Sequence, residues 1–215
     1  MDFADLPDVE YSGFISIFHD DDETCKKSAY VIKSIFRSDK FIVKVGQFNV
    51  TNIKEHFELV KKLGRSFQKY IFYSISLGRV NTDLPILKLK VANDSLFQKE
   101  KEFNPEKIIR EILGIKNYII IIDSSNCVIR KFTPNYYFYN NNLPYLLDEP
   151  GGIVICSNSW YIQGIGTFMT LCMDQLKGNK FDNLSDLVDE LNKNIAEMCG
   201  SFNLPFDKIK IKINE

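Results

Sequence analysis

The run of four isoleucines at 119–122 constrains the fold of this chain more than any other feature of its sequence. Consecutive β-branched apolar residues are typical of a strand that is buried on both faces, so other elements must cover both sides of its sheet. The polar stretch 123–127, Asp-Ser-Ser-Asn-Cys, follows directly. We therefore predict a buried strand that ends in a polar loop, where many α/β enzymes hold a nucleophile. Ser124, Ser125 and Cys127 are the candidates.

Apolar periodicity predicts alternating strands and helices on both sides of this run. Strands are expected over residues 13–18, 41–46, 70–78, 86–91 (in a small hairpin) and 208–214 (at a sheet edge), and helices over 20–36, 51–67, 104–114, 159–176 and 183–198. Strands that alternate with helices favour a parallel sheet covered by helices. The predicted fold is therefore α/β, with a mostly parallel central sheet and helices on both of its faces.

The bulk composition argues against several classes of function. A net charge of -1 and a pI near 6.2 disfavour binding of nucleic acid through a broad basic face. No apolar run approaches the roughly 18 residues that a membrane span needs, and the acidic N-terminus does not resemble a secretory signal. Five widely spaced cysteines without a C-x-x-C pair predict reduced thiols in a cytoplasmic protein. No motif predicts a metal or a cofactor.

The C-terminal third carries a resemblance to a known family. The stretch 159–163, Ser-Trp-Tyr-Ile-Gln, is similar to the Ser-Trp-Phe-Ile-Gln motif of the caspase small subunit. Two helices and a terminal strand are expected from there on, as in caspases. The resemblance implies a caspase-like sandwich formed by a single uncleaved domain. Its expected organisation is a tail over 1–12 and a domain over 13–215, large-subunit-like over 13–132 and small-subunit-like over 133–215.

Both catalytic groups of the family are missing from the matching positions. The caspase nucleophile lies in Gln-Ala-Cys-(Arg/Gln)-Gly, with a histidine about 50 residues upstream. Ser125 stands where the resemblance puts the cysteine, and Leu77, followed by Gly78, stands where it puts the histidine of Ser-His-Gly. Leucine cannot transfer a proton, and a serine without a base is a poor nucleophile. The resemblance therefore implies a pseudocaspase with two degenerate catalytic positions.

The groups that would bind an aspartate substrate are missing as well. Caspases hold the substrate carboxylate between two arginines, because guanidinium pairs bidentately with carboxylate, and a glutamine before the cysteine assists. Asp123 stands at that glutamine position and would repel a second carboxylate. The first strand–helix loop, residues 19–27, contains no arginine, and neither do residues 133–159. We therefore expect the aspartate pocket to be lost.

Two enzymatic alternatives stay open on the same α/β scaffold. The acidic cluster Asp20–Asp22 would suit a metal-dependent hydrolase, since clustered carboxylates bind divalent cations. Acidic side chains at the start of a helix are the simpler interpretation of the same residues. Ser125 would serve a serine hydrolase, but neither His19 nor His56 is placed to activate it, and both histidines are expected at the surface.

Three further features have a structural and a functional interpretation. Cys127 is either a displaced nucleophile or, as we expect, a loop cysteine without function. Gly164 and Gly166 are expected inside a helix, where they indicate close packing and not phosphate binding. The Tyr/Asn-rich stretch 134–142 is either a binding loop or a variable one.

The terminal strand is the predicted interface. Active caspases dimerise through this strand, so the resemblance implies heterodimerisation with a caspase or a caspase-regulating protein, or a decoy role, in the regulation of apoptosis. Lysines opposite lysines would weaken a symmetric pair, which predicts a monomer or weak homodimer of the protein alone. The predicted interface residues are Lys208, Ile209, Lys210, Ile211, Lys212 and Ile213.

Overall fold

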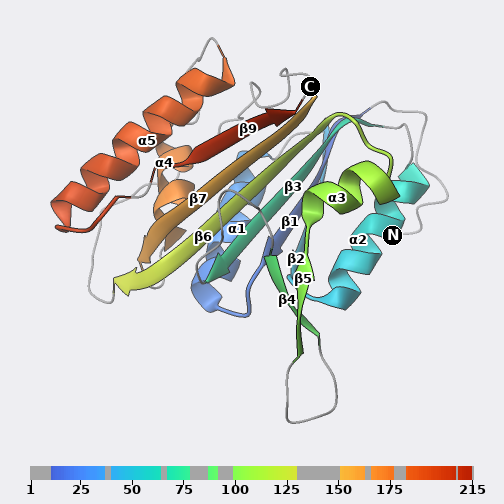
Figure 1. Cartoon of the computed structure of the whole chain (residues 1–215), viewed down its shortest axis with the longest axis horizontal. Coiled ribbons are helices and arrows are strands. Elements are labelled where there is room, and N and C mark those ends of the chain that lie inside the picture. The colour runs from blue at the N-terminus through green and yellow to red at the C-terminus, as the bar shows by residue number, and fades with distance from the viewer. Residues whose placement is uncertain are drawn as a thin grey trace.

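A single large sheet organises the computed structural model (Figure 1). The described residues are 11–36, 40–63, 67–77, 87–91, 99–129, 151–162, 166–176, 183–206 and 208–214. Most of the expected tail, and all of the Tyr/Asn-rich stretch 134–142, lie outside them. Residues 11 and 12, which were assigned to the tail, instead begin the first strand.

The strands and helices alternate along the chain as the sequence predicts. In order they are β1 (Tyr11–His19), α1 (Glu23–Ile35), β2 (Phe41–Gln47), α2 (Val50–Leu63), β3 (Phe67–Leu77), β4 (Leu87–Val91), β5 (Lys99–Phe103), α3 (Pro105–Lys107), the π-helical turn η2 (Ile108–Ile112), β6 (Tyr118–Ile129), β7 (Gly152–Ile162), β8 (Gly166–Thr167), α4 (Phe168–Leu176), α5 (Leu184–Ser201) and β9 (Lys210–Asn214).

The main sheet has the order β2-β1-β3-β6-β7-β8, and β9 also pairs with β7. Neighbours from β2 to β7 run parallel, whereas β8 and β9 pair antiparallel with β7. Strands β4 and β5 form a separate antiparallel hairpin, in which β4 matches the strand expected over 86–91 and β5 was not predicted. The prediction of a mostly parallel central sheet is therefore confirmed.

Helices cover both faces of this sheet, as predicted. Alternate residues of each strand point to opposite faces, so the central strands are buried on both. On one face, the α1-side core joins the strands to α1, α4 and α5; it includes Ile15, Ile17, Ala29, Ile32, Ile71, Ile119, Ile121, Ile153, Met169, Cys172, Leu191 and Ile195. On the other face, the α2-side core joins them to α2 and η2; it includes Phe14, Phe18, Ile53, Phe57, Val60, Tyr70, Phe72, Phe103, Ile109, Tyr118, Ile120 and Ile122.

Two predicted helix boundaries are wrong. The helix expected over 51–67 ends at Leu63, and Phe67 begins β3, where it packs against Phe14 of β1 and Tyr70 of its own strand. The helix expected over 159–176 begins only at Phe168. Its first residues belong to β7 instead, because they find strand partners in β6 and β8.

The second of these corrections also affects the glycines and the family motif. Gly166 lies in β8 and not in a helix, and Gly164 lies outside the described residues. Ser159–Ile162, which resembles a caspase motif expected to open a helix, forms the end of β7. That local match is therefore misplaced, and the likeness to caspases has to rest on the fold.

Close packing of Gly152 against Tyr118 gives a first prediction. The two are register partners on β7 and β6, and a Cβ at Gly152 would lie 2.5 Å from the Tyr118 ring and hydroxyl. Because Tyr118 is itself buried, Gly152→Ala should destabilise the fold by about 1–3 kcal/mol through overpacking. Urea unfolding measures this change. The control is Gly200→Ala on α5, where a Cβ meets nothing within 4 Å; equal stability of the two variants would contradict the prediction.

Candidate functional site

The carboxyl end of β3, where it pairs with β6, brings the two degenerate positions together. These strands pair in parallel, and Leu77 lies directly opposite Ser125 in their register. Ser76 and Ser124, and before them Ile75 and Asp123, are the preceding partners. The carboxyl ends of neighbouring parallel strands lie at one edge of the sheet, which is where α/β proteins place functional groups. Gly78 lies outside the described residues.

The polar loop expected after Asp123 is instead a continuation of β6. The strand runs to Ile129, and its pairing with β7 is irregular between Ser125 and Val128. Ser124, Ser125 and Cys127 therefore lie on a strand, so the description of Cys127 as a loop cysteine is wrong. Pairing with β7 supplies partners to Ser124 and Ser125 and resumes at Val128, and that long-range pairing overrides the local preference of these residues for a loop. The Ser124 hydroxyl is buried and donates to the Ser157 carbonyl at 2.8 Å.

Asp123 is fully buried, and two threonine hydroxyls bind its carboxyl group. Thr167 Oγ1 donates to Asp123 Oδ2, and Thr170 Oγ1 approaches the same oxygen at 3.1 Å. Thr167 also accepts a hydrogen bond from the Thr170 amide at 3.0 Å, and so caps the start of α4. The carboxyl of Asp123 thus faces the first turn of a helix, a location that favours negative charge.

Sequence reasoning missed the two threonines because they were assigned to the interior of a helix. Thr167 lies directly before α4 and Thr170 in its first turn, on the α1 side of the sheet. The Ser28 hydroxyl of α1 accepts from the Thr167 amide at 3.4 Å, so the polar cluster links β6, β8, α4 and α1. The sequence did offer one signal of a helix start: Thr167 follows a glycine directly and precedes Thr170 by three residues.

Asp123 also influences the buried groups around it. Burial raises the pKa of Tyr73 well above its ordinary value, and the charge of Asp123 adds to this effect. Burial likewise raises the pKa of the Cys25 thiol, helped by the carboxylates of Asp20, Asp22 and Asp123. Cys25 therefore stays a thiol at neutral pH and is not a substitute nucleophile.

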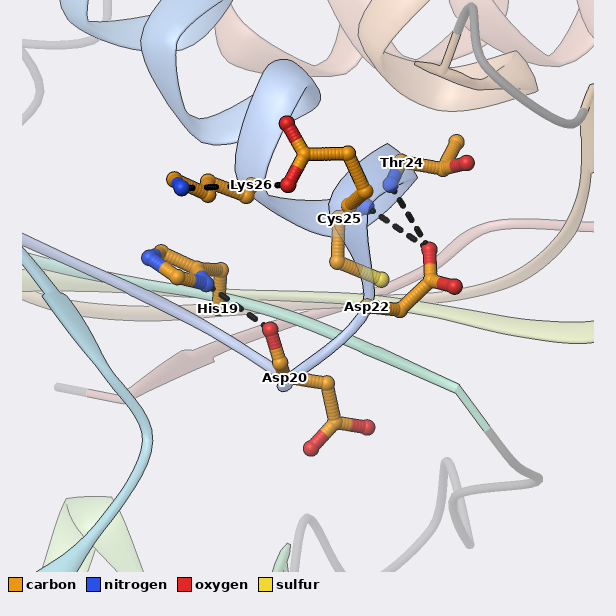
Figure 2. A network of polar contacts seen from close by, with 7 residues as sticks. His19, Asp20, Asp22, Thr24, Cys25 and Lys26 are labelled. Carbon is orange, nitrogen blue, oxygen red and sulfur yellow. Dashed lines mark hydrogen bonds and ion pairs between the residues drawn. The ribbon is translucent and has the colours of Figure 1, made fainter.

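The acidic segment 20–22 forms the entry to α1 (Figure 2). Asp22 Oδ1 accepts from the amides of Thr24 at 2.8 Å and Cys25 at 3.2 Å, so Asp22 is the N-cap that the simpler interpretation predicts. In the same view the Asp20 carboxyl points away from this first helical turn. Among the described residues, no three His, Cys, Asp or Glu side chains come together as a possible metal site.

The two histidines differ in their environments. His19 is half-buried and its Nδ1 lies 2.8 Å from the Asp20 carbonyl oxygen. His56 is buried, and its ring packs on Phe18 with centroids 4.6 Å apart. The expectation of a surface position is therefore wrong for His56, because it lies on the inner face of α2. Burial, helped by the positive charge of Lys44, lowers the pKa of His56 from 6.5 to about 4.

The predicted interface strand forms the edge of the sheet beside β7. Residues 210–214 pair antiparallel with Gly152–Cys156 of β7. Two hydrogen bonds fix the approach to this strand: Asn192 Oδ1 accepts from the Ile209 amide at 2.7 Å, and Trp160 Nε1 donates to the Pro205 carbonyl at 2.9 Å. The strand expected over 208–214 begins at Lys210; of the two residues before it, Lys208 is exposed and Ile209 is buried.

Comparison with solved structures shows what this arrangement resembles. The fold is similar to a crystal structure of caspase-1 from Spodoptera frugiperda, with a TM-score of 0.55 and 10% sequence identity over 95% of this chain and 87% of that chain. A structure of pro-sf-caspase-1 gives a TM-score of 0.54 and 10% identity over 95% of this chain and 92% of that chain. The chain has a caspase-like fold.

Sequence comparison adds no family assignment to the fold. No protein-family model matches the sequence, and no curated protein matches it. Within the parts of the chain that the structure describes, no helix has the length and apolar character to cross a membrane.

Proposed function

We propose that this protein is a catalytically inactive caspase-like protein that binds active caspases and modulates them, and thereby regulates apoptosis. The observation that carries the proposal is the pairing of Leu77, the last residue of β3, with Ser125 of β6. A caspase needs a base and a thiol at two such positions. A leucine side chain neither accepts nor donates a proton, so a serine opposite it lacks activation.

The surroundings of Asp123 support the same proposal. The resemblance matches Asp123 to the glutamine that helps caspases to hold a substrate aspartate. In this chain the Asp123 carboxyl is itself held by Thr167 and Thr170. The hydroxyl donors of this cluster therefore serve an internal carboxyl group, and a substrate carboxylate that approached it would meet a like charge.

Restoring the catalytic pair gives the second prediction. The Leu77→His/Ser125→Cys variant should cleave Asp-containing fluorogenic peptides no faster than the wild-type protein, because Asp123 remains in place. The assay is fluorescence release at high protein concentration, with an active caspase as a positive control. Efficient cleavage by the double variant would contradict our interpretation of the pocket. Wild-type cleavage that Ser125→Ala abolishes would support a serine hydrolase instead.

The edge strand β9 is the proposed surface for a caspase partner. Among the described residues it pairs with β7 alone, and its other edge is the one that would receive a strand from a second molecule. The exposed Lys208 and the alternating lysines after it favour a partner strand with acidic or neutral residues over a second copy of this chain.

Charge reversal on β9 gives the third prediction. Lys208, Lys210 and Lys212 changed together to glutamate should weaken capture of a caspase in co-expression pull-downs and leave the circular dichroism spectrum unchanged. The wild-type protein alone should sediment as a monomer or weak dimer. A matched control makes the same charge reversal at Lys61 and Lys62, which are exposed on α2. This variant should still capture the caspase. A tight homodimer that the β9 changes do not affect would contradict this surface assignment.

A further inference from the structure

One buried hydroxyl beside Asp123 has no hydrogen-bond partner among the described residues. It is that of Ser157, whose side chain is 1% exposed. Ser157 lies directly opposite Asp123 in the parallel register of β6 and β7, so both side chains point to the same face of the sheet. Ile153 and Ile155, which alternate with it along β7, place that face on the α1 side. A buried polar atom without a partner costs free energy, so a ligand for this hydroxyl would stabilise the fold.

Three further oxygen atoms lie close together on the same face. The hydroxyl oxygens of Thr167 and Thr170 are 2.8 Å apart, and both contact Asp123 Oδ2. A hydroxyl has one proton and two lone pairs, so each threonine keeps acceptor capacity after it donates to the carboxyl group. Asp123, Ser157 and both threonines are buried. Oxygen-bearing side chains from β6, β7, β8 and α4 thus gather inside the core.

The surroundings of this oxygen cluster are electrostatically negative. After burial, the carboxylates of Asp20, Asp22 and Asp123 are the groups that raise the pKa of the Cys25 thiol. Tyr73 also responds to Asp123. No basic side chain of the described residues is among the charges that act on the pKa values of Cys25 and Tyr73. The start of α4 supplies only about half a unit of positive charge. The cluster therefore favours a positive ion.

The ligand set indicates the kind of ion. Oxygen atoms suit hard cations, whereas imidazole and thiolate suit transition metals. Among the described residues, no three His, Cys, Asp or Glu side chains come together, so the cluster does not resemble a site for a divalent metal. One carboxylate with neutral hydroxyls balances a single positive charge.

We propose that Asp123, Ser157, Thr167 and Thr170 bind a monovalent alkali cation, sodium or potassium, inside the fold. The Asp123 carboxylate balances the charge of the ion, and the three hydroxyls supply further oxygen ligands. Ser157 thereby gains the partner that the described residues do not give it. The ion ties β6 and β7 to the start of α4. This site goes beyond the proposed function, because it needs no caspase partner.

The test compares the melting temperature of the full chain in sodium chloride, potassium chloride and choline chloride at equal ionic strength. Choline is too large to enter a packed core, so it controls for general salt effects. The melting temperature should be higher in an alkali salt than in choline chloride, by about 2–4 °C when the cation is at roughly five times its Kd. The salt with the larger shift identifies the ion. Equal melting temperatures in all three salts would overturn the proposal.

Ser157→Ala tests whether the ion binds at this cluster. If the loss of this ligand weakens binding tenfold, the difference between alkali and choline salts should fall to about a quarter. Asp123→Asn should abolish the difference. The matched control is Ser74→Ala, which removes an equally buried hydroxyl without a described partner on the α2 side and should keep the full difference. A difference that Ser157→Ala or Asp123→Asn leaves unchanged would overturn the assignment. If Asp123→Asn fails to fold, the contrast between the two serine variants decides.

Discussion

Acidification from above pH 6.5 to below pH 4 should cost this protein about 3 kcal/mol of folding free energy through His56 alone. The pKa of His56 is about 4 in the fold and 6.5 as its ordinary value. Between these values the unfolded chain binds a proton that the folded chain does not, so stability rises with pH. The contribution is complete above pH 6.5 and is lost as the pH falls through 4.

The control for this prediction is His56→Phe, which keeps a ring against Phe18 and removes the titrating group. Urea unfolding at several pH values should show a shallower loss of stability for this variant than for the wild-type protein. Carboxylates contribute to acid unfolding in both proteins, so the difference between the two curves isolates the histidine. Parallel curves from pH 7 to pH 4 would contradict the assignment.

Replacing both threonines beside Asp123 by valine should destabilise the protein by about 2–4 kcal/mol, because the buried carboxyl group would lose two hydrogen-bonding hydroxyls. Valine has nearly the shape of threonine, so the loss would reflect hydrogen bonding more than packing. Thr167→Val also removes the cap of α4, which accounts for about 1 kcal/mol of this effect. Thermal or urea unfolding measures the change.

A rescue experiment tests whether the charge of Asp123 causes this loss. Adding Asp123→Asn to the Thr167→Val/Thr170→Val variant should recover part of the lost stability, since a neutral amide tolerates burial better than a carboxylate. Thr167→Ser retains the hydroxyl and should be close to wild type. Asp123→Asn that further destabilises the double valine variant would show that the carboxyl does not depend on these donors.

The sheet was predictable from sequence because its signals are local and strong. The isoleucines at 119–122 and the strands around residues 15 and 43 are apolar runs that fit only a sheet covered on both faces. Asn104 and Asn183 cap their helices, and asparagine before a helical segment is a signal that can be recognised in the sequence. The alternation in residues 86–91 likewise predicted β4 as part of a hairpin, although it did not identify the partner strand β5.

The errors arose where tertiary contacts override local pattern. Residues 159–162 have apolar and aromatic side chains that suit a helix or a strand, and only pairing with β6 and β8 decides for the strand. His56 was expected to be solvated because it is polar. It lies instead on the same buried face of α2 as Ile53, Phe57 and Val60. The partners of Asp123 lie more than forty residues away in the chain, so no local signal connects them.

The strand order has a consequence for how the chain folds during synthesis. β1 emerges first, β2 then adds to one side of it and β3 to the other, and β6, β7 and β9 follow outward from β3 in the order in which they are made. Every strand of the main sheet therefore finds its partner already synthesised, and none has to insert between two strands that are already paired. Parallel sheets assemble slowly because their contacts are distant in sequence. Vectorial growth from the ribosome lets this one assemble from its N-terminal half, strand by strand.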